Sequence, residues 1–463
     1  MITRAHLAER GDAPALIDDA TERWLDYRGL ARAVGEAVEC LSAIGDRPLV
    51  FLFSGDMIAD CVAYLGCREA GAAVGLFGVT LPPGRADALI QHYLPDLVIG
   101  HAPEAGYGEV LRPTGGIWYR RLSGDGPMLH PDLALLLSTS GSTGSPKLVR
   151  LSRTAVDANA ASIAEVLQIA PGQRSVLNLP IAYSYGLSVL NSHLWAGAAV
   201  LLTRQGITSP AYWRRIAEQR VTAMPGVPMV YEILRRLGFD ALAPAGLTTL
   251  TQAGGKLAEP LIDHFHGIMA RRGGRFFVMY GATEACARMA ILPPDRLPDK
   301  LGAAGMAIPG GRFETVACEQ GDEVVYHGPN VMMGYAEAAA DLALGDVLGG
   351  RLATGDLGRL DVDGVLWITG RAKRIAKVNG LRLNLDEAEA LAAARFAPAA
   401  AFADDRTLTL LIEADDRAAP EIRREMAVAL ALAPASLRIK CVARLPLSNN
   451  GKIDRDAAGK LVA

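Results

Sequence analysis

The sequence lacks the features that mark several common classes of protein. Its six cysteines form no C-x-x-C pair, which argues against a zinc knuckle or a disulfide framework and predicts reduced thiols. Lys and Arg number 47 against 50 Asp and Glu, for a net charge of -3, and no basic run occurs, so we expect no nucleic-acid partner. The apolar runs are far shorter than the ~20 residues that cross a bilayer. The first ten residues lack the apolar run of a signal peptide, so we expect a cytoplasmic protein without a membrane span.

What is present is a large, evenly charged and hydrophobic chain. It has 463 residues, half of them hydrophobic, and this length predicts two or three domains. Runs typical of strands alternate with helical ones, as where the apolar run Pro48–Phe53 is followed by Met57–Ala70, in which Ile58, Cys61 and Leu65 recur at helical spacing. This alternation predicts an α/β fold with parallel sheets covered by helices.

The pattern changes after about residue 300. Shorter strand candidates, Glu323–Tyr326 and Val365–Thr369, are separated by Gly, Asp and Pro turns, as in an antiparallel β region. The end of the chain holds two helical runs, Leu385–Arg395 and Pro420–Leu432, with strand candidates between and after them. We therefore expect a small α+β domain there, joined to the larger part near Lys373.

A loop rich in glycine and hydroxyl groups gives the strongest local signal. It follows the apolar run Leu133–Leu137 and reads S-T-S-G-S-T-G-S-P-K. Glycines let backbone N–H groups approach phosphate oxygens, hydroxyls donate hydrogen bonds and a lysine adds charge. The spacing is not that of a Walker A loop, and a flexible linker rarely follows a buried strand. We expect phosphate contacts from Thr139, Ser140, Gly141, Ser142, Thr143, Gly144 and Lys147.

This loop resembles the signature of the adenylate-forming superfamily, which includes acyl- and aryl-CoA synthetases, peptide-synthetase adenylation domains and luciferases. Six further motifs follow in that family's order, so the resemblance covers nearly the whole chain. Departures are few: Leu148 stands where glycine is usual and Ala376 where isoleucine is usual, and neither removes a polar catalytic group. The six motifs are Leu179–Gly186, Ala253–Lys256, Tyr280–Glu284, Thr354–Asp356, Gly370–Lys373 and Pro446–Lys452.

The resemblance implies both an architecture and a reaction. A large N-terminal domain, residues 1–371, would combine doubly wound sheets with a β-barrel-like part. A small, mobile α+β domain, residues 372–463, would rotate about Lys373 and carry a catalytic lysine. The implied reaction is ATP-dependent activation of a small-molecule carboxylic acid to acyl-AMP with release of pyrophosphate. A thiol, either of CoA or of the phosphopantetheine on an acyl carrier protein, would then accept the acyl group, and the sequence does not rank these two.

The chemistry explains why these residue types are needed. ATP and a carboxylate are both anions, so catalysis depends on positioning and charge neutralisation. The resemblance implies that Glu284 binds Mg²⁺, that Thr283 lies near the α-phosphate and that Lys452 bridges it to the carboxylate. It implies ribose contacts from Asp356 and ribose or phosphate contacts from Arg371. The alternatives are that Glu284 caps a helix, that Asp356 is a turn residue and that Lys452 is a solvated charge. Further nucleotide contacts are implied for Gly254, Gly255, Lys256, Tyr280, Gly281 and Ala282.

The segment Tyr183, Ser184, Tyr185 and Gly186 is the expected substrate pocket. Amino-acid-activating members carry an aspartate at the position of Ser184, and a buried ammonium without a counter-charge would be costly, so an α-amino acid is disfavoured. The two tyrosines fit an aromatic or a short to medium aliphatic acid, or are simply core residues. Arg288 is expected to face solvent, the alternative being contact with a second polar group of the substrate.

Other functions stay open at this point. An amide-forming ligase, a kinase or ATPase that uses the glycine-rich loop, and a non-catalytic nucleotide-binding relative are the alternatives. The basic residues around the hinge motif are expected either to meet CoA phosphates or an acidic carrier-protein helix, or to form a solvated face. This set comprises Arg371, Lys373, Arg374, Lys377 and Arg382.

Overall fold

The structure, a computed structural model, divides into two compact units. The N-terminal unit comprises Met1–Arg312 and Tyr326–Leu352, and the C-terminal unit comprises Phe313–Val325 and Ala353–Ala463. The residues that the structure describes are 2–20, 23–55, 57–110, 118–138, 147–378, 381–404, 406–430, 432–448 and 452–462.

A nine-stranded sheet forms one layer of the N-terminal unit, in the order β16-β15-β14-β13-β12-β10-β11-β1-β2. The strands from β14 to β1 are parallel, and their short apolar runs are buried on both faces, as expected where helices cover a parallel sheet. Its strands are β1 (Pro14–Asp18), β2 (Trp24–Asp26), β10 (Arg174–Leu177), β11 (Ala199–Leu202), β12 (Ala223–Gly226), β13 (Thr249–Gln252), β14 (Arg275–Tyr280), β15 (Ala290–Leu292) and β16 (Met306–Ala307).

An eight-stranded sheet forms a second layer, in the order β19-β9-β8-β4-β3-β5-β7-β6. Strands β5, β3, β4 and β8 are parallel, and the other neighbours are antiparallel. Its strands are β3 (Leu49–Ser54), β4 (Ala73–Gly78), β5 (Leu97–Ile99), β6 (Tyr107–Val110), β7 (Trp118–Arg121), β8 (Leu133–Ser138), β9 (Leu148–Ser152) and β19 (Gly334–Ala336).

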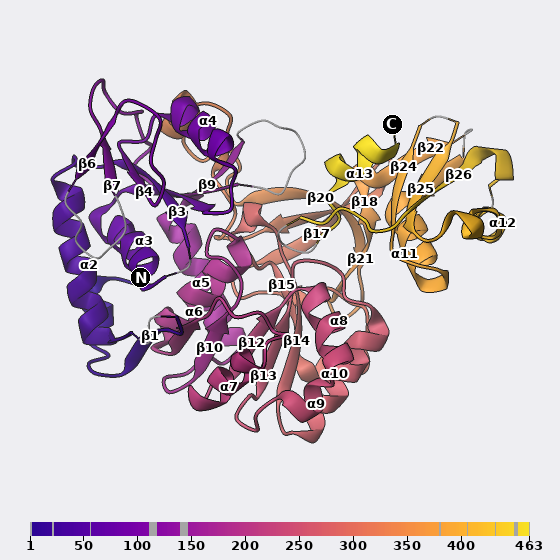
Figure 1. Ribbon diagram of the computed structural model, residues 1–463, viewed down its shortest axis with the longest axis horizontal. Helices are drawn as coiled ribbons and strands as arrows, with labels where there is room; N and C mark the ends of the chain where they lie inside the picture. The colour runs from indigo at the N-terminus through magenta and orange to yellow at the C-terminus, as the bar shows by residue number, and fades with distance from the viewer. Residues whose placement is uncertain are drawn as a thin grey trace. The chain divides into compact units, whose positions relative to one another are not determined.

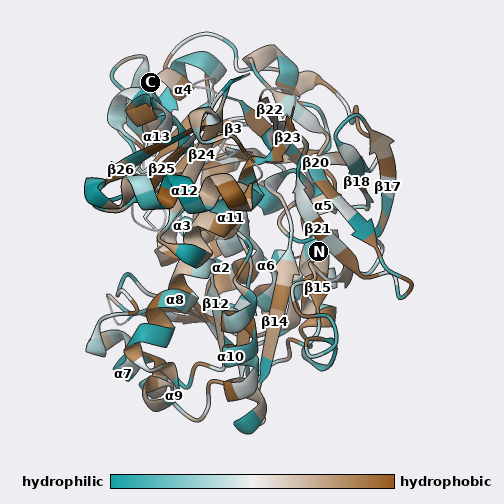
Figure 2. Ribbon diagram, turned by 90° about the vertical axis from the view of Figure 1, so that its right-hand side faces the viewer, coloured by the Kyte–Doolittle hydropathy of each residue, from teal (hydrophilic) through white to brown (hydrophobic). Residues whose placement is uncertain are grey.

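Four helices lie between these two sheets (Figure 1). Helix α6 (Ser184–Ala196) packs on β10 and β11, while α5 (Arg153–Val166) packs on β8 and β9 and also contacts α6. Helix α3 (Ile58–Ala70) likewise contacts both β1 and β3, and α2 (Tyr27–Ser42) packs on it. The outer helices α7 and α8 carry hydrophilic colour, whereas β14 is largely hydrophobic (Figure 2). The remaining helices of this unit are α1 (Arg4–Ala8), α4 (Pro83–Tyr93), α7 (Pro210–Glu218), α8 (Pro228–Leu237), α9 (Phe239–Leu242) and α10 (Glu259–Arg271).

The C-terminal unit joins most of an antiparallel sheet to a small α+β layer. The four-stranded sheet has the order β17-β18-β20-β21, and the strands β22 and β23 form a separate hairpin. A three-stranded sheet, β24-β25-β26, shares its core with α11 and α12. The elements are β17 (Arg312–Cys318), β18 (Gly321–His327), β20 (Arg351–Leu360), β21 (Leu366–Arg371), β22 (Ile375–Val378), β23 (Leu381–Asn384), α11 (Leu385–Arg395), β24 (Ala399–Ala403), β25 (Leu408–Glu413), α12 (Ala419–Ala429), β26 (Leu437–Val442) and α13 (Arg455–Val462).

The predicted α/β class, with a large sheet-rich part and a smaller C-terminal α+β part, is confirmed. The predicted helix Leu385–Arg395 coincides with α11, because Asn384 caps it by accepting hydrogen bonds from the first turn. The predicted domain boundary at 371/372 stays a prediction. The two compact units divide the chain at other places, within the antiparallel sheet. No helix in the described part of the chain combines the length and the apolar character that crossing a membrane requires.

Candidate active site

Three predicted segments of the N-terminal unit follow parallel strands of the nine-stranded sheet. Residues 178–183 follow β10, residues 253–256 follow β13, and residues 281–284 follow β14. The carboxyl ends of parallel strands lie at one edge of a sheet, which is where ligands bind in open α/β folds. Gly254 has φ +87°, and a Cβ placed on it would lie 2.6 Å from the Tyr183 hydroxyl. The predicted nucleotide-binding segment at Gly254 and the predicted substrate segment at Tyr183 therefore touch.

Two hydroxyl groups link the substrate segment to the predicted catalytic segment. Ser184 is the first residue of α6 and is buried, and its Oγ lies 3.3 Å from the Thr283 Oγ1. Gly186 lets the first turn of α6 approach the preceding chain, because a Cβ there would lie 2.2 Å from the Pro180 carbonyl oxygen. Backbone packing thus fixes the position of Ser184 beside Thr283.

A tight hairpin fixes the segment that carries Thr283 and Glu284. A Cβ on Gly281 would lie 1.6 Å from the Ala287 carbonyl oxygen, so only glycine fits there. The chain then turns through positive φ values of 59° at Cys286 and 148° at Ala287. Non-glycine residues held at positive φ store strain and often mark functional sites. Residues Tyr280 and Ala282 flank Gly281; Met289 N donates to the Tyr280 carbonyl, and Ala282 is extended.

The Glu284 carboxylate belongs to a chain of contacts that ends at the predicted phosphate lysine. The Tyr335 hydroxyl donates to Glu284 Oε1 at 2.8 Å. The ammonium of Lys147 lies 3.8 Å from the centroid of the Tyr335 ring and 3.3 Å from Glu337 Oε1. Register explains the meeting, because Tyr335 on β19 pairs with Val149 on β9, two residues after Lys147. Tyr335 thus connects the two predicted ligand groups.

The remaining predicted nucleotide-binding residues of this unit have fewer contacts in the structure or lie outside the described residues. Gly255 and Lys256 are exposed, and the Gly255 carbonyl accepts from Gln252 Nε2 at 2.7 Å. The predicted phosphate residues Thr139 to Gly144 lie outside the described residues, so their roles stay predictions.

Arg288 corrects the sequence analysis. Arg288 is not solvent-facing as predicted but only 2 % exposed, and its guanidinium carbon lies 4.0 Å from the centroid of the Tyr185 ring. The periodicity around Glu284 gave no sign of this, because the hairpin turns residues 286–288 back into the core. Tyr185 is also buried, and its hydroxyl donates to the Thr251 carbonyl on β13 at 2.8 Å.

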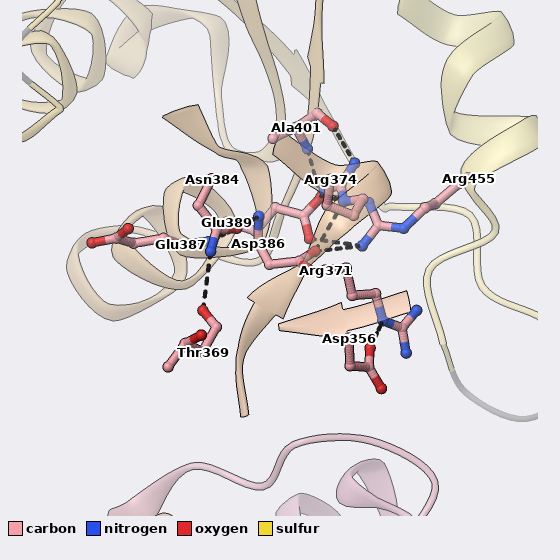
Figure 3. Close-up of polar contacts among 10 residues, drawn as sticks. All are labelled: Asp356, Thr369, Arg371, Arg374, Asn384, Asp386, Glu387, Glu389, Ala401 and Arg455. Atoms are coloured by element: carbon pink, nitrogen blue, oxygen red, sulfur yellow. Dashed lines mark hydrogen bonds and ion pairs between the residues drawn. The ribbon is translucent and has the colours of Figure 1, made fainter. Parts of the chain in front are cut away.

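In the C-terminal unit the predicted ribose and phosphate residues form an ion pair (Figure 3). Asp356 on β20 is opposite Arg371 on β21, and Arg371 Nε donates to Asp356 Oδ1 at 3.0 Å. Asp356 is 8 % exposed, whereas Arg371 is mostly exposed. The strand register therefore brings these two motifs together although 15 residues separate them.

Lys452 lies beside a short β-bridge. Leu447 pairs with Ile453, and Ser448 N donates to the Lys452 carbonyl at 2.7 Å. Desolvation lowers the pKa of Lys452, the positive charge of Arg371 lowers it further, and Asp356 opposes both effects. Lys452 itself is exposed, and its lowered pKa means that it gives up its proton more readily than an ordinary lysine.

Glu389, which the sequence analysis did not single out, binds two arginines that lie close in sequence to the predicted residues Lys373 and Lys452 (Figure 3). Glu389 on α11 binds Arg374 at 2.5 Å and Arg455, at the start of α13, through both carboxylate oxygens at 2.5 and 2.8 Å. Arg374 ends the 3₁₀ turn η4 (Ala372–Arg374), in which the predicted hinge residue Lys373 lies. Arg374 is therefore bound by acids rather than forming the solvated or ligand-binding face expected for the basic set.

Neither Tyr335 nor Glu389 could have been found from a local motif. Tyr335 is 51 residues from Glu284, and Glu389 is 66 residues from Arg455. A lone tyrosine in a short strand and one acid among several in a helix have no distinctive spacing. Only the strand register and the packing of α13 bring them to their partners.

Comparison with known proteins gives a consistent picture. Residues 3–336 match the model of the family described as AMP-binding enzyme. Indoleacetate–CoA ligase from Aromatoleum aromaticum is 30 % identical over 297 residues, which are 60 % of this chain and 57 % of the ligase. This chain thus spans little more than half of that relative. Feruloyl-CoA synthase from an Amycolatopsis species is 28 % identical over 75 % of this chain and 74 % of its own.

Solved structures share the fold over nearly the whole length. O-Succinylbenzoate CoA synthetase from Bacillus subtilis in complex with AMP superposes with a TM-score of 0.76 at 22 % identity, covering 97 % of both chains. The same synthetase with ATP and magnesium gives a TM-score of 0.73, covering 97 % of this chain and 98 % of its own.

Proposed function

Because the chain belongs to the family of AMP-binding enzymes, we propose that it activates a carboxylic acid with ATP and transfers the acyl group to a thiol. A carboxylate oxygen attacks the α-phosphorus, the bond from that phosphorus to pyrophosphate breaks, and acyl-AMP forms. The thiol of CoA or of a carrier-protein phosphopantetheine then attacks the acyl carbon, and AMP leaves with the acid's oxygen. Both steps need positioned groups and neutralised charge more than they need covalent help from the protein.

The observation that carries this proposal is the linked set Lys147–Tyr335–Glu284 beside Thr283 and Ser184. It combines a cation, a carboxylate and two hydroxyls at the carboxyl ends of parallel strands. The Lys147 side chain is about one-third exposed and its partner Glu337 is mostly exposed, so this pair contributes little stability and can be exchanged for a phosphate. Asp356, Arg371 and Lys452 would supply the ribose contacts and the second cation.

Magnesium fits the donor set of this site. Mg²⁺ prefers oxygen ligands and commonly takes one or two carboxylates together with substrate phosphates. In the described ranges no cluster of three or more His, Cys, Asp and Glu side chains gathers, so Glu284 would act as a single carboxylate ligand. Its Oε1 is oriented by Tyr335. When bound, the ion would neutralise phosphate charge.

An α-amino acid is a poor substrate for such a site. Ser184 is buried where an ammonium would need a negative partner, and the nearby buried charge, that of Arg288, is positive. Burying an ammonium without a counter-charge costs several kcal/mol, on the order of the penalties measured for unpaired buried ions. We therefore propose an acid without an α-amino group.

Acid-dependent exchange of labelled pyrophosphate into ATP, over a panel of carboxylic acids, tests the proposal. We expect exchange with at least one acid, followed by AMP and thioester when CoA or a phosphopantetheine-loaded carrier protein is added. Release of inorganic phosphate and ADP without exchange would instead support a kinase or ATPase. Acyl-AMP formation with transfer only to amines would identify an amide-forming ligase.

A further inference from the structure

Arg288 is a buried cation without an anionic partner. Its Nε donates to the Met279 sulfur at 3.2 Å, and its guanidinium lies over the Tyr185 ring. Among the described residues, no carboxylate and no oxygen acceptor is bonded to this guanidinium. Burial lowers the pKa of Arg288, which expresses the cost of holding its charge there. A face contact with an aromatic ring compensates only part of that cost.

Two other buried arginines show how this protein usually satisfies such a group. Arg68 pairs with Asp157 at 2.6 Å. Arg150 donates to four backbone carbonyls, among them those of Tyr335 and Met333. Buried charges without such partners are strongly destabilising. Arg288 differs from both, and a ligand that brings an anion would complete it.

The groups around Arg288 are chemically compatible with the anionic end of a substrate. Arg288 borders a small cavity of about 20 Å³ whose lining contains no acid. Val189 and Pro225 supply apolar surface, while Thr251 and Ser192 supply hydroxyls. Two other ionisable residues belong to the lining. Arg275 is bound to Gln168 at 2.8 Å, and His193 is neutral because burial lowers its pKa to about 4, with its Nδ1 donating to the Val189 carbonyl. Arg288 is thus the cation of the lining that lies beside Tyr185.

The position of Arg288 is fixed relative to the proposed reacting groups. The hairpin that places Ala287 against Gly281 also carries Thr283 and Glu284. The Arg288 carbonyl accepts from the side-chain amides of Asn159 at 2.9 Å and Asn330 at 2.8 Å. These contacts hold the Arg288 backbone in place on the same hairpin as Thr283.

We propose that Arg288 binds a second anionic group of the acid, so that the preferred substrates are dicarboxylic acids. This inference rests on the proposed function and narrows its substrate class. One carboxylate would react at the phosphorus, and the other would pair with the Arg288 guanidinium, which lies against the Tyr185 ring. Carboxylic acids with a distal sulfonate would also bring an anion to Arg288, and the experiment below compares distal carboxylates with distal sulfonates.

The test uses pairs of acids matched in length. In each pair one acid carries an anionic distal group, either a carboxylate or a sulfonate, and the other carries a neutral methyl ester. We expect kcat/KM for exchange to favour the anionic member of at least one pair by ~10²-fold, the scale for a buried charge pair. Arg288→Met should reduce that ratio to near one, and Arg288→Lys should retain part of it. Arg275→Met is the comparison variant, because Arg275 lines the same cavity but is bound to Gln168 at 2.8 Å; it should reduce the ratio much less than Arg288→Met does.

Binding to the wild-type protein gives a readout that does not depend on the variants folding. The anionic member should raise the unfolding temperature more than its ester does, because ligands that bind only the folded state stabilise it. Equal use of both members by the wild type, or an unchanged ratio in Arg288→Met, would overturn the inference while leaving the proposed function intact. Absence of exchange with every acid would overturn the proposed function as well.

Discussion

The two units present their predicted catalytic groups in opposite ways. In the N-terminal unit, Ser184, Thr283 and Tyr335 are hydroxyl groups held by strand ends and a strained hairpin against a dense core. In the C-terminal unit, Glu389 binds two arginines, and Lys452 stands exposed beside a single β-bridge. Packing thus fixes the groups proposed to recognise the acid, whereas the ion pairs of Glu389 hold Arg374 and Arg455, the latter three residues after Lys452.

This difference has a physical consequence. Buried hydroxyls and backbone contacts are little affected by salt, but partly exposed ion pairs are screened by it. Loss of a packed group should therefore alter both half-reactions or the choice of acid. Loss of a group in the C-terminal unit should alter one half-reaction selectively. The following experiments test this division.

The largest effect is expected from Lys452→Ala. Removing a positioned charge should slow adenylation by ~10²–10³-fold. Transfer from pre-made acyl-AMP should be nearly unaffected, because that step begins after the phosphorus has reacted. Single-turnover measurements of each half-reaction check this. Lys460→Ala removes another exposed lysine from the same unit and should change neither step; equal losses in both steps for Lys452→Ala would refute the assignment.

A smaller effect is expected from Tyr335→Phe, which keeps the ring under Lys147 but removes the hydrogen bond to Glu284. Hydrogen bonds to charged groups contribute about 1.5–3 kcal/mol, so kcat/KM for exchange should fall roughly tenfold or more. Tyr212→Phe is the control: Tyr212 is buried, and its hydroxyl has no hydrogen-bond partner in the part of the chain that the structure describes. That variant should keep full activity and unfold at the same or a higher temperature.

Glu389→Gln should have a still smaller, selective effect. It weakens the contacts to Arg374 and Arg455, so the loop of Lys452 is less well positioned, and adenylation should fall by roughly three- to tenfold. Transfer from acyl-AMP should be spared. Glu387→Gln, an exposed change on the same helix, should be silent. A Glu389→Gln protein that loses both half-reactions equally would indicate a purely structural role.

The smallest effect concerns pH. Lys452 must be protonated to supply charge, so adenylation should decline as pH rises through its pKa, which lies below that of an ordinary lysine. Removing the positive charge in Arg371→Gln should move this alkaline limb of kcat/KM to higher pH. The profile for transfer from acyl-AMP should lack the limb. A limb that Arg371→Gln leaves in place, or moves down, would contradict the assignment.

Much of the fold could be predicted because its signals are local. Apolar runs of strand length alternate with helical periodicity, and Asn384 marks the start of α11. The motif residues at strand ends were also predictable, since a Cβ at Gly254 or Gly281 would lie within 3 Å of a neighbouring group and glycine is needed there. Such close contacts restrict the residue type and so leave a pattern in the sequence.

The parts that could not be predicted depend on contacts between distant segments. The meeting of Tyr335 with Glu284 follows from the register of β19 on β9. The burial of Arg288 follows from a hairpin whose positive φ values occur at a cysteine and an alanine rather than at glycine, so no turn signal marked it. The ion pairs of Glu389 depend on the packing of α13.

One measurement tests the central claim most directly: the fate of an oxygen atom of the acid. A substrate labelled with ¹⁸O in its carboxylate is incubated with ATP and the thiol acceptor, and the products are analysed by mass spectrometry. If the carboxylate attacks the α-phosphorus, one labelled oxygen must appear in AMP. Label found in inorganic phosphate, or AMP formed without label, would contradict adenylation of the acid.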